Sequence, residues 1–396
     1  MDRGPPLLLL LLAPPVLSLS FLQMTSGAFL IYVIKRIAFS LVLFIISVAA
    51  GDDTLLPDHL RLLRYNIDNV TFWKSLAPSL HVFNDSEARR QHIFEESEIL
   101  GTQYTSEGLR QDLKTKGYFV LHAREDFDAF KDLPLENMVR LIELLFSMNL
   151  PVQLCFLYDE FWFLFSRLDK LLHGVIFSGN EYLRLPDLWA WRIDASKGDR
   201  GWYPHRDKQY DAPGSEEEKV AAEKAALGEK LDVVPPISAR DRVLWKDGSP
   251  KSVTIWIPLT PALKNNSCIH VLPADMDSTY ATESTLDLSS PSVLNRFSAL
   301  PALPGSVFVW NHWLYHFGGG GKSPLPRISL SIEFQTASVP AFCPWTSSPL
   351  LLPTFEHRFL IIAEMLARYA HMTSDTDKQQ LMGVLEEHFV SQDSRI

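Results

Sequence analysis

Cysteine is scarce in this sequence, with only three among 396 residues. Cys155, Cys268 and Cys343 lie too far apart to form a disulfide framework or a zinc motif of closely spaced thiols. Positive charge is in deficit as well, because 47 acidic residues against 37 lysines and arginines leave a net charge of -10. Nucleic-acid-binding surfaces are normally basic, so this balance argues against a nucleic-acid partner. The 46% of hydrophobic and 11% of aromatic residues are typical of a globular protein with a sizeable core.

An uncharged run of membrane-spanning length is missing too. The apolar stretch 27–51 carries Lys35 and Arg36 near its middle, and a charge at the bilayer centre costs roughly 2.5 to 3.5 kcal/mol. We therefore place the apolar core of a signal sequence at 37–48, before small residues that suit cleavage. Basic residues before this core and acidic residues after it put the rest of the chain on the lumenal side. The sequence thus predicts a signal or membrane-anchor region over 1–51, with the protein in the secretory pathway, either lumenal or attached to the membrane. A buried core helix is the alternative.

Three N-glycosylation sequons begin at Asn69, Asn84 and Asn265. Such triplets are common by chance and matter only if the chain is translocated. A glycoprotein is therefore expected only as a consequence of the predicted entry into the secretory pathway.

Residues 52–182 have a mainly helical pattern, interrupted by one short predicted strand at 117–121. Apolar residues recur at helical spacing in 135–148, and an aromatic-rich helical pattern follows in 154–176. We interpret the phenylalanines of this second pattern as core residues. The segment is expected to form a helical layer that packs on a sheet.

Residues 183–339 consist of short runs rich in Trp, Val and Ile, separated by Pro, Gly, Asn and Asp. The predicted strands are Leu188–Ile193, Ser252–Ile257, Ile269–Leu272, Ser306–Trp310 and Ile328–Phe334. Many short strands with turn signals between them are typical of a barrel or jelly roll. The predicted fold class is therefore mainly β with flanking helices (α+β).

Two further segments flank or interrupt this β region. Residues 211–250 form an insertion, and its part 215–230 is rich in Ala, Glu and Lys at helical spacing. Because this part is polar nearly all round, it is expected to be a surface helix or a lid. Residues 340–396 return to a helical pattern, with predicted helices at 354–370 and 376–389.

The first chemical signal is the motif Trp202-Tyr203-Pro204-His205-Arg206-Asp207. Residues i and i+2 of an extended segment point the same way, so His205 and Asp207 could bind one metal ion from one side. No other histidine in the sequence is followed two residues later by an acidic residue. A satisfied surface pair is the alternative interpretation of the motif taken alone.

The second signal lies about a hundred residues further on and supplies His312, His316 and Arg327. Two histidines and one carboxylate on one face of an ion form the facial triad of non-heme Fe(II) oxygenases. Strand alternation puts Arg327 and Ser329 on one face, and a buried arginine needs a partner such as a bidentate carboxylate. The glycines at 318–321 allow close backbone approach to a ligand.

Over about 188–334 the chain resembles the phytanoyl-CoA dioxygenase family of Fe(II)/2-oxoglutarate oxygenases. Three blocks carry the resemblance: His205-Arg206-Asp207; Trp256 followed after nine residues by Asn266-Ser267-Cys268-Ile269 and then Val271-Leu272-Pro273; and a histidine eleven residues before an arginine, His316 and Arg327. The ordered combination is far more specific than any single block.

The resemblance implies a double-stranded β-helix (cupin-like) core with helical layers at both ends. It implies that His205, Asp207 and His316, but not His312, bind Fe(II). Arg327 would bind the far carboxylate of 2-oxoglutarate, helped by Ser329, with Trp256 as a further cofactor-binding residue and O2 as the oxidant. The implied reaction is hydroxylation of a small-molecule or lipid-like substrate with release of succinate and CO2. Relatives that halogenate carry a small residue at the position of Asp207.

The sequence departs from the family at several places, including one within the second block and one within the third. Phe317-Gly318-Gly319 stands where the family usually has Gly-Ser-Gly, and Asn266-Ser267 replaces an Asn-Gly turn. Two other classes of function stay open. Two imidazoles and a carboxylate also suit zinc, which would make the protein a hydrolase. A non-catalytic, membrane-anchored binding module on the same fold is the third possibility.

Overall fold

The computed structural model describes residues 58–82, 104–123, 130, 132–207, 238–282, 284–342 and 352–368. Several sequence predictions fall outside these ranges: the signal or membrane-anchor region 1–51, the sequon at Asn84, the helix at 215–230 and the last helix at 376–389. Within the described ranges, no helix is both long enough and apolar enough to cross a membrane.

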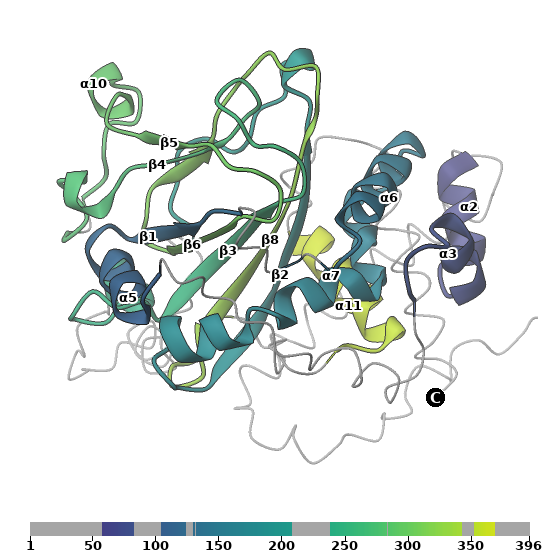
Figure 1. The fold of residues 1–396 in the computed structure, drawn as a ribbon, viewed down its shortest axis with the longest axis horizontal. Helices are drawn as coiled ribbons and strands as arrows, with labels where there is room; N and C mark the ends of the chain where they lie inside the picture. Colours follow the sequence, from purple (N-terminus) through teal and green to yellow (C-terminus); the bar gives the residue numbers. More distant parts are fainter. Residues whose placement is uncertain are drawn as a thin grey trace, which may run out of the picture.

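A five-stranded antiparallel sheet forms the centre of the fold, in the order β1-β6-β3-β8-β2 (Figure 1). Its strands are β1 (Tyr118–Leu121), β2 (Tyr182–Ile193), β3 (Ser252–Pro258), β6 (Val307–Asn311) and β8 (Arg327–Thr336). The registers place Trp256 of β3 opposite Ser331 of β8 on one side and Phe308 of β6 on the other. Residues far apart in the sequence therefore lie side by side at the centre of this sheet.

The two faces of this sheet differ in composition because side chains alternate along each strand. One face presents apolar side chains to the main hydrophobic core. They are Leu188 and Ala190 of β2, Val253, Ile255 and Ile257 of β3, Val307 and Val309 of β6, and Ile328, Leu330, Ile332 and Phe334 of β8. The opposite face carries the tryptophan, threonine, serine, arginine and glutamate side chains that line a cavity.

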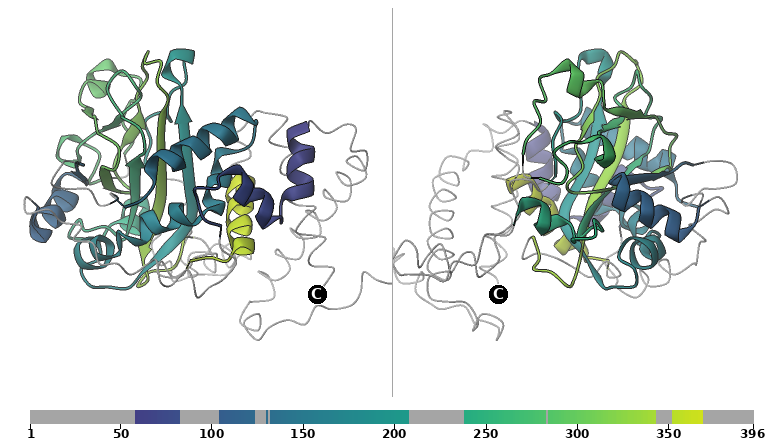
Figure 2. Two further views of the ribbon diagram at one scale, coloured as in Figure 1. Left: turned by 45° about the vertical axis from the view of Figure 1, so that its right-hand side comes forward. Right: turned by 90° about the vertical axis from the view of Figure 1, so that its left-hand side faces the viewer.

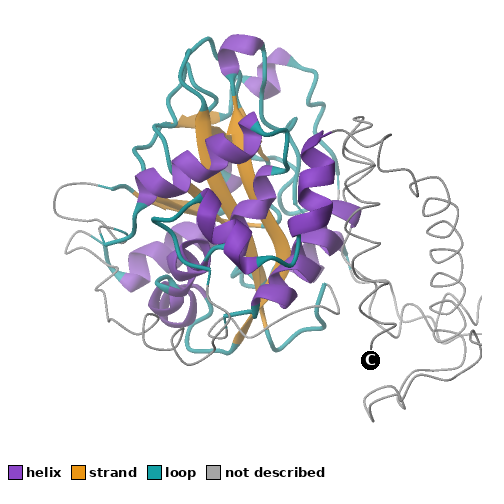
Figure 3. Ribbon diagram, turned by 90° about the vertical axis from the view of Figure 1, so that its right-hand side faces the viewer, coloured by secondary structure: helices purple, strands orange, loops and turns teal. Residues whose placement is uncertain are grey.

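A helical layer covers the apolar face (Figure 3). It contains α6 (Leu135–Ser147), η4 (Val152–Leu157), α7 (Asp159–Ser166), η5 (Leu171–Ile176) and α11 (Phe355–Arg368). Helix α6 fits this place because Met138, Leu141, Ile142 and Leu145 recur at helical spacing and are all buried. Helices α2 (Asp58–Asn66) and α3 (Val70–Leu76) extend the layer, with the Trp73 ring 6.0 Å from the Phe359 ring of α11.

A second, three-stranded antiparallel sheet lies on the other side of the molecule from the helical layer (Figures 1 and 2). Its middle strand is β4 (Ile269–Val271), flanked by β5 (Ser298–Leu300) and β7 (His316–Gly318). The remaining short elements are α5 (Ser106–Thr115), η6 (Ala195–Lys197), α9 (Ala239–Val243), η7 (Ala274–Met276) and α10 (Pro291–Leu294). Antiparallel sheets with flanking helices make the fold class α+β, as the sequence pattern predicts.

One helical prediction needs correction. The pattern at 154–176 forms three short pieces instead of one helix, and Tyr158 between η4 and α7 is extended, with φ -97° and ψ 145°. A long-range contact stabilises the break, because the Asp159 N–H donates to the His81 carbonyl at 2.9 Å and the Glu160 carboxylate accepts from the His81 N–H at 3.1 Å. The phenylalanines of this pattern are buried, as expected.

Candidate metal centre

The His-x-Asp segment is held beside the small sheet by its own backbone. His205 N–H donates to the His316 carbonyl at 3.1 Å, and His316 N–H donates to the His205 carbonyl at 3.0 Å. This isolated antiparallel bridge brings the two histidines together although 111 residues separate them, and their ring centroids lie 4.4 Å apart. His205 sits in an extended segment, and His316 is the first residue of β7.

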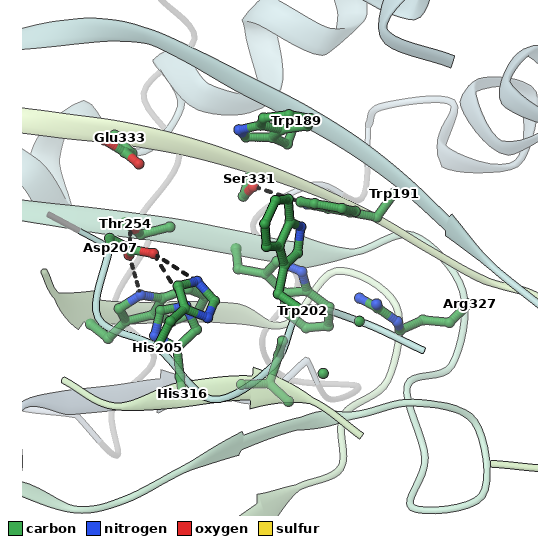
Figure 4. Close-up of a pocket in the computed structure, with 15 residues that line it drawn as sticks. Trp189, Trp191, Trp202, His205, Asp207, Thr254, His316, Arg327, Ser331 and Glu333 are labelled. Atoms are coloured by element: carbon green, nitrogen blue, oxygen red, sulfur yellow. Dashed lines mark hydrogen bonds and ion pairs between the residues drawn. The ribbon is translucent and has the colours of Figure 1, made fainter. Parts of the chain in front are cut away.

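Three potential ligand atoms converge at this bridge (Figure 4). The Oδ1 atom of Asp207 lies 3.5 Å from Nε2 of His205 and 3.3 Å from Nε2 of His316. The Nδ1 atom of each ring faces a main-chain carbonyl, at 2.6 Å from Tyr203 and 3.1 Å from Leu314. Such contacts fix the tautomer of a ligating histidine and direct its Nε2 lone pair toward the metal. The predicted neighbours i and i+2 do point the same way.

The second carboxylate oxygen of Asp207 is occupied by neighbouring strands of the large sheet. Thr254 Oγ1 of β3 donates to Oδ2 at 2.6 Å, and the Trp310 indole N–H of β6 donates to the same atom at 2.9 Å. One oxygen is therefore oriented by hydrogen bonds while Oδ1 faces the two imidazoles. This arrangement suits a carboxylate that binds a single ion through one oxygen. Sequence reasoning missed Thr254 and Trp310, although both lie on strands that it predicts.

The charges of these three residues stabilise one another. Burial alone would raise the pKa of the Asp207 carboxyl, but the charge of His316 and hydrogen bonds from His205 and His316 hold it well below its ordinary value. Burial lowers the pKa of the His205 imidazole, and the hydrogen bond and charge of Asp207 outweigh this effect, so the net shift is upward. The carboxylate is thus ionised, as a metal ligand must be.

Arg327 is a buried cation on the same face of the large sheet. The residue is 2% exposed, its Nη1 donates to Ser329 Oγ at 2.8 Å, and its guanidinium carbon lies 5.4 Å from the Trp256 ring centroid. Among the residues that the structure describes, none forms an ion pair with Arg327, and its Nε has no hydrogen-bond partner. Burial lowers the pKa of Arg327 to about 10. The structure thus brings the three predicted cofactor-binding residues together, with Ser329 and Trp256 beside an Arg327 cation that has no counter-charge in the described ranges.

The histidines, Asp207 and Arg327 share one cavity of about 150 Å³, with Arg327 across from the other three (Figure 4). Five tryptophans line it: Trp189 and Trp191 of β2, Trp202, Trp256 of β3 and Trp310 of β6. The rings of Trp189 and Trp191 stack at 5.0 Å, and Trp191 meets Trp202 edge-on at 6.1 Å. The signal in the sequence was Trp189-x-Trp191, which places two rings on one face of a strand.

A second group of possible ligands overlaps the first. Asp207, His312 and Glu333 offer ligand atoms within 4.8 Å of one another, and His312 Nε2 lies 3.8 Å from Glu333 Oε2. His312 is fully buried and does not line the cavity, whereas His316 does. The choice of His316 over His312 made from the sequence stays a prediction, and the cavity favours it.

Three of the four glycines at 318–321 pack closely against protein, while Gly320 has open space beside it, so the close approach expected from the sequence is mainly to other chain segments. A Cβ at Gly318 would lie 2.7 Å from the Gly201 Cα, one at Gly319 would lie 2.5 Å from the His270 ring, and one at Gly321 would lie 2.1 Å from the Asn265 carbonyl oxygen. Gly318 and Gly201 also line the cavity, so their contact closes one wall of it. Only glycine allows this backbone packing.

The two departures from the family motif have distinct structural settings. The Phe317 ring stacks on His270 at 4.7 Å and meets Phe297 at 5.2 Å, and Phe317 does not line the cavity. Ser267 has a φ of 53°, in the left-handed region that glycine adopts more easily. Its hydroxyl is buried and lacks a hydrogen-bond partner in the described part of the chain.

No family model matches the sequence, and no curated protein matches it. Among solved structures, the non-heme α-ketoglutarate-dependent epimerase SnoN from nogalamycin biosynthesis is similar with a TM-score of 0.40 and 15% identity, over 59% of this chain and 81% of SnoN. The non-heme α-ketoglutarate-dependent carbocyclase SnoK is similar with a TM-score of 0.36 and 14% identity, over 61% of this chain and 88% of SnoK. HygX from Streptomyces hygroscopicus, with nickel and 2-oxoglutarate bound, is similar with a TM-score of 0.39 and 14% identity, over 59% of this chain and 88% of HygX.

Proposed function

We propose that the protein is an Fe(II)/2-oxoglutarate-dependent dioxygenase that hydroxylates a small-molecule substrate. One observation carries the proposal: two imidazoles and a carboxylate converge at one end of a cavity that also holds a buried arginine with no ion-pair partner among the described residues. A metal ion with open coordination positions would explain why the imidazoles and the carboxylate converge. A dicarboxylic co-substrate would explain the buried arginine, because its far carboxylate would supply the missing counter-charge.

We further propose that the two sheets are the halves of a double-stranded β-helix of the phytanoyl-CoA dioxygenase type. In support, His316 belongs to the small sheet and Arg327 to the large sheet, while both line the cavity. The ten residues between them include Gly318, Gly319 and Gly321, which pack against other chain segments. This placement accounts for the spacing on which the resemblance depends.

Each side chain has a defined task in the proposed reaction. His205, Asp207 and His316 would hold the ion, and Thr254 with Trp310 orients the carboxylate. When bound, Fe(II) with 2-oxoglutarate and O2 would supply oxidative decarboxylation to succinate and CO2, with one oxygen atom going to succinate and the other to the substrate as a hydroxyl group. Arg327 and Ser329 bind and orient the far carboxylate, beside the Trp256 ring. The tryptophans of the cavity exclude water from the reacting groups.

A carboxylate at position 207 favours hydroxylation, because its side chain fills the space that a halide would need. A zinc hydrolase would use the same three ligands, but it gives no reason to bury Arg327 against Ser329. Burial of a cation is costly unless a counter-charge is supplied. The oxygenase is therefore the better-supported function.

The test is calorimetric titration of 2-oxoglutarate into the Fe(II)-loaded protein without oxygen. Losing the cation of a buried ion pair costs about 3 to 5 kcal/mol, so Arg327→Ala should weaken 2-oxoglutarate binding by about two to three and a half orders of magnitude. Arg327→Lys should recover only part of the affinity, because an ammonium replaces a planar fork. Fe(II) binding should survive both changes. If Arg327→Ala binds 2-oxoglutarate as tightly as the parent, or if the parent does not bind it, the oxygenase assignment is wrong.

Fe(II) binding also tests the choice of His316 over His312 as the third ligand, the one that follows His205 and Asp207 in the sequence. His205→Ala, Asp207→Ala and His316→Ala should each abolish Fe(II) binding at micromolar metal, whereas His312→Ala should retain it. If His312→Ala loses Fe(II) and His316→Ala keeps it, the metal site would instead consist of Asp207, His312 and Glu333.

A further inference from the structure

Arg206 stands between two of the proposed ligands in sequence, yet its side chain is directed away from them. His205 and Asp207 line the cavity, and Arg206 does not. Its side chain is fully buried and forms an ion pair with Asp277, whose side chain is equally buried, at 2.8 Å between Nη2 and Oδ2. The alternation that aims His205 and Asp207 at the cavity thus aims Arg206 at the protein behind it.

Asp277 is itself held in place by its neighbours. Its Oδ1 accepts from the Thr279 main-chain N–H at 2.8 Å and from Thr279 Oγ1 at 2.7 Å, while Thr279 Oγ1 also accepts from Arg206 Nη2 at 3.2 Å. The Asp277 main-chain carbonyl accepts from the Tyr280 N–H at 3.1 Å. The guanidinium therefore meets a carboxylate with little freedom to move.

Two aromatic rings enclose the same guanidinium. Its carbon lies 4.0 Å from the Trp313 ring centroid and 4.1 Å from the Tyr315 ring centroid. The Trp313 indole N–H donates to the Tyr280 carbonyl at 2.9 Å. Trp313 and Tyr315 belong to the turn that leads directly into His316. Arg206 therefore connects the segment that supplies two ligands to the segment that supplies the third.

We infer that Arg206 is a positioning residue that sets the relative placement of His205, Asp207 and His316, an inference that rests on the metal site proposed above. A buried ion pair contributes little net stability, because the desolvation of both charges offsets their attraction. What it does supply is a fixed geometry, and altering groups that orient the ligands of a metal site typically changes metal affinity by 10- to 100-fold. Arginine suits this place because its planar cation stacks between rings while it pairs with a carboxylate.

The chain offers a matched control in a second buried arginine–aspartate pair. Arg358 of α11 and Asp159 of α7 have fully buried side chains, lie 2.5 Å apart and belong to the helical layer, away from the cavity. Arg206→Met and Arg358→Met therefore remove equally buried cations. Only the first touches residues adjacent to the ligands. A purely structural role would make the two variants behave alike.

The experiment measures Co(II) affinity by titration, with the visible Co(II) spectrum as a second readout and thermal unfolding as the control for folding. Arg206→Met and Asp277→Asn should each weaken Co(II) binding by about 10- to 100-fold and change the spectrum. Arg206→Lys should recover part of the affinity. Arg358→Met should lower the unfolding temperature while the folded protein binds Co(II) within about twofold of the parent.

The outcomes separate this inference from the proposed function. If Arg206→Lys and Asp277→Asn bind Co(II) as the parent does, with the same spectrum, Arg206 has no positioning role although the metal site stands. An equal loss of affinity in Arg358→Met would also overturn the inference, because general destabilisation would then account for the effect. A parent protein that binds no Co(II) would overturn the metal site itself and this inference with it. Should Arg206→Met fail to fold, Asp277→Asn decides, since it keeps the side-chain shape and removes the charge.

Discussion

The two faces of the five-stranded sheet are built from the same strands, but one packs into the hydrophobic core and the other lines the cavity. Along β8, Ile328, Leu330, Ile332 and Phe334 are at most 1% exposed and pack under the helical layer. The residues between them are Arg327, Ser329, Ser331 and Glu333, which are buried as well, at 2%, 0%, 7% and 8%. Burial alone therefore does not separate a stabilising residue from a functional one. The polarity of what is buried does.

Burying the polar face lowers the stability of the folded protein. A buried charged or hydroxyl group loses its hydration, and only a good partner compensates for that loss. On this face Arg327 has no ion-pair partner among the described residues, whereas the apolar face gains its free energy from folding itself. We expect substitutions on the two faces to separate stability from ligand binding.

The largest effect is expected from the apolar face. Phe334→Ala removes a side chain that is 1% exposed and meets the Tyr182 ring at 5.8 Å. Loss of a buried phenylalanine should lower the free energy of unfolding by about 3 to 5 kcal/mol, measured by urea denaturation. Co(II) affinity of the folded variant should stay unchanged, because the side chain faces away from the cavity.

Ser331→Ala is the matched control on the other face of the same strand. Its hydroxyl accepts from the Trp191 indole N–H at 3.3 Å, so its removal should cost no more than about 1 kcal/mol. A stability loss in Ser331→Ala that equals the loss in Phe334→Ala would contradict the division of labour between the faces.

The second-largest effect is an increase in stability, on the polar face. Arg327→Met replaces a buried cation that has no ion-pair partner among the described residues with an apolar side chain of similar length. Without 2-oxoglutarate the variant should be more stable than the parent by about 1 to 3 kcal/mol, because an unsatisfied buried polar group is removed. Adding 2-oxoglutarate should raise the unfolding temperature of the parent and leave that of the variant unchanged. A variant less stable than the parent without 2-oxoglutarate would mean that Arg327 already has an anionic partner.

The smallest effect concerns the pH dependence of metal binding. The hydrogen bond and charge of Asp207 raise the pKa of His205 above its ordinary value of about 6.5. Metal binds the neutral imidazole, so Co(II) affinity should be constant above the raised pKa and fall as the pH drops through it, by about tenfold per pH unit for each proton displaced. Titrations at a series of pH values check this. Affinity that stays flat or rises toward acid pH would contradict it.

Without metal the pH dependence of stability has the reverse sign. A histidine whose pKa is raised on folding stabilises the folded state below the unfolded pKa of about 6.5, and this contribution is lost as the pH rises through the folded value. The metal-free protein should therefore lose the His205–Asp207 contribution to stability as the pH rises through the raised pKa of His205, whereas metal binding strengthens over the same range. Unfolding temperatures with and without Co(II) at each pH separate the two.

Local periodicity in the sequence was enough to predict several of the strands and the faces on which their side chains lie. The strands at 252–257 and 306–310 are found within one residue of their expected ends, because their alternation and flanking turn residues are local signals. The i, i+2 rule also places Arg327 with Ser329, and His205 with Asp207, on common faces. Strand β7 was not predicted, since His316-Phe317-Gly318 carries no strand pattern of its own.

By itself the sequence determined the α+β class and the identity of the residues on the two faces of each strand, because a two-residue period is a property of the local backbone. Tertiary structure alone decided which residues surround the site. Thr254, Trp310 and Asp277 reach Asp207 and Arg206 from 47, 103 and 71 residues away. Those contacts depend on the register between remote strands and on how the segment at 274–280 packs, which no local pattern encodes.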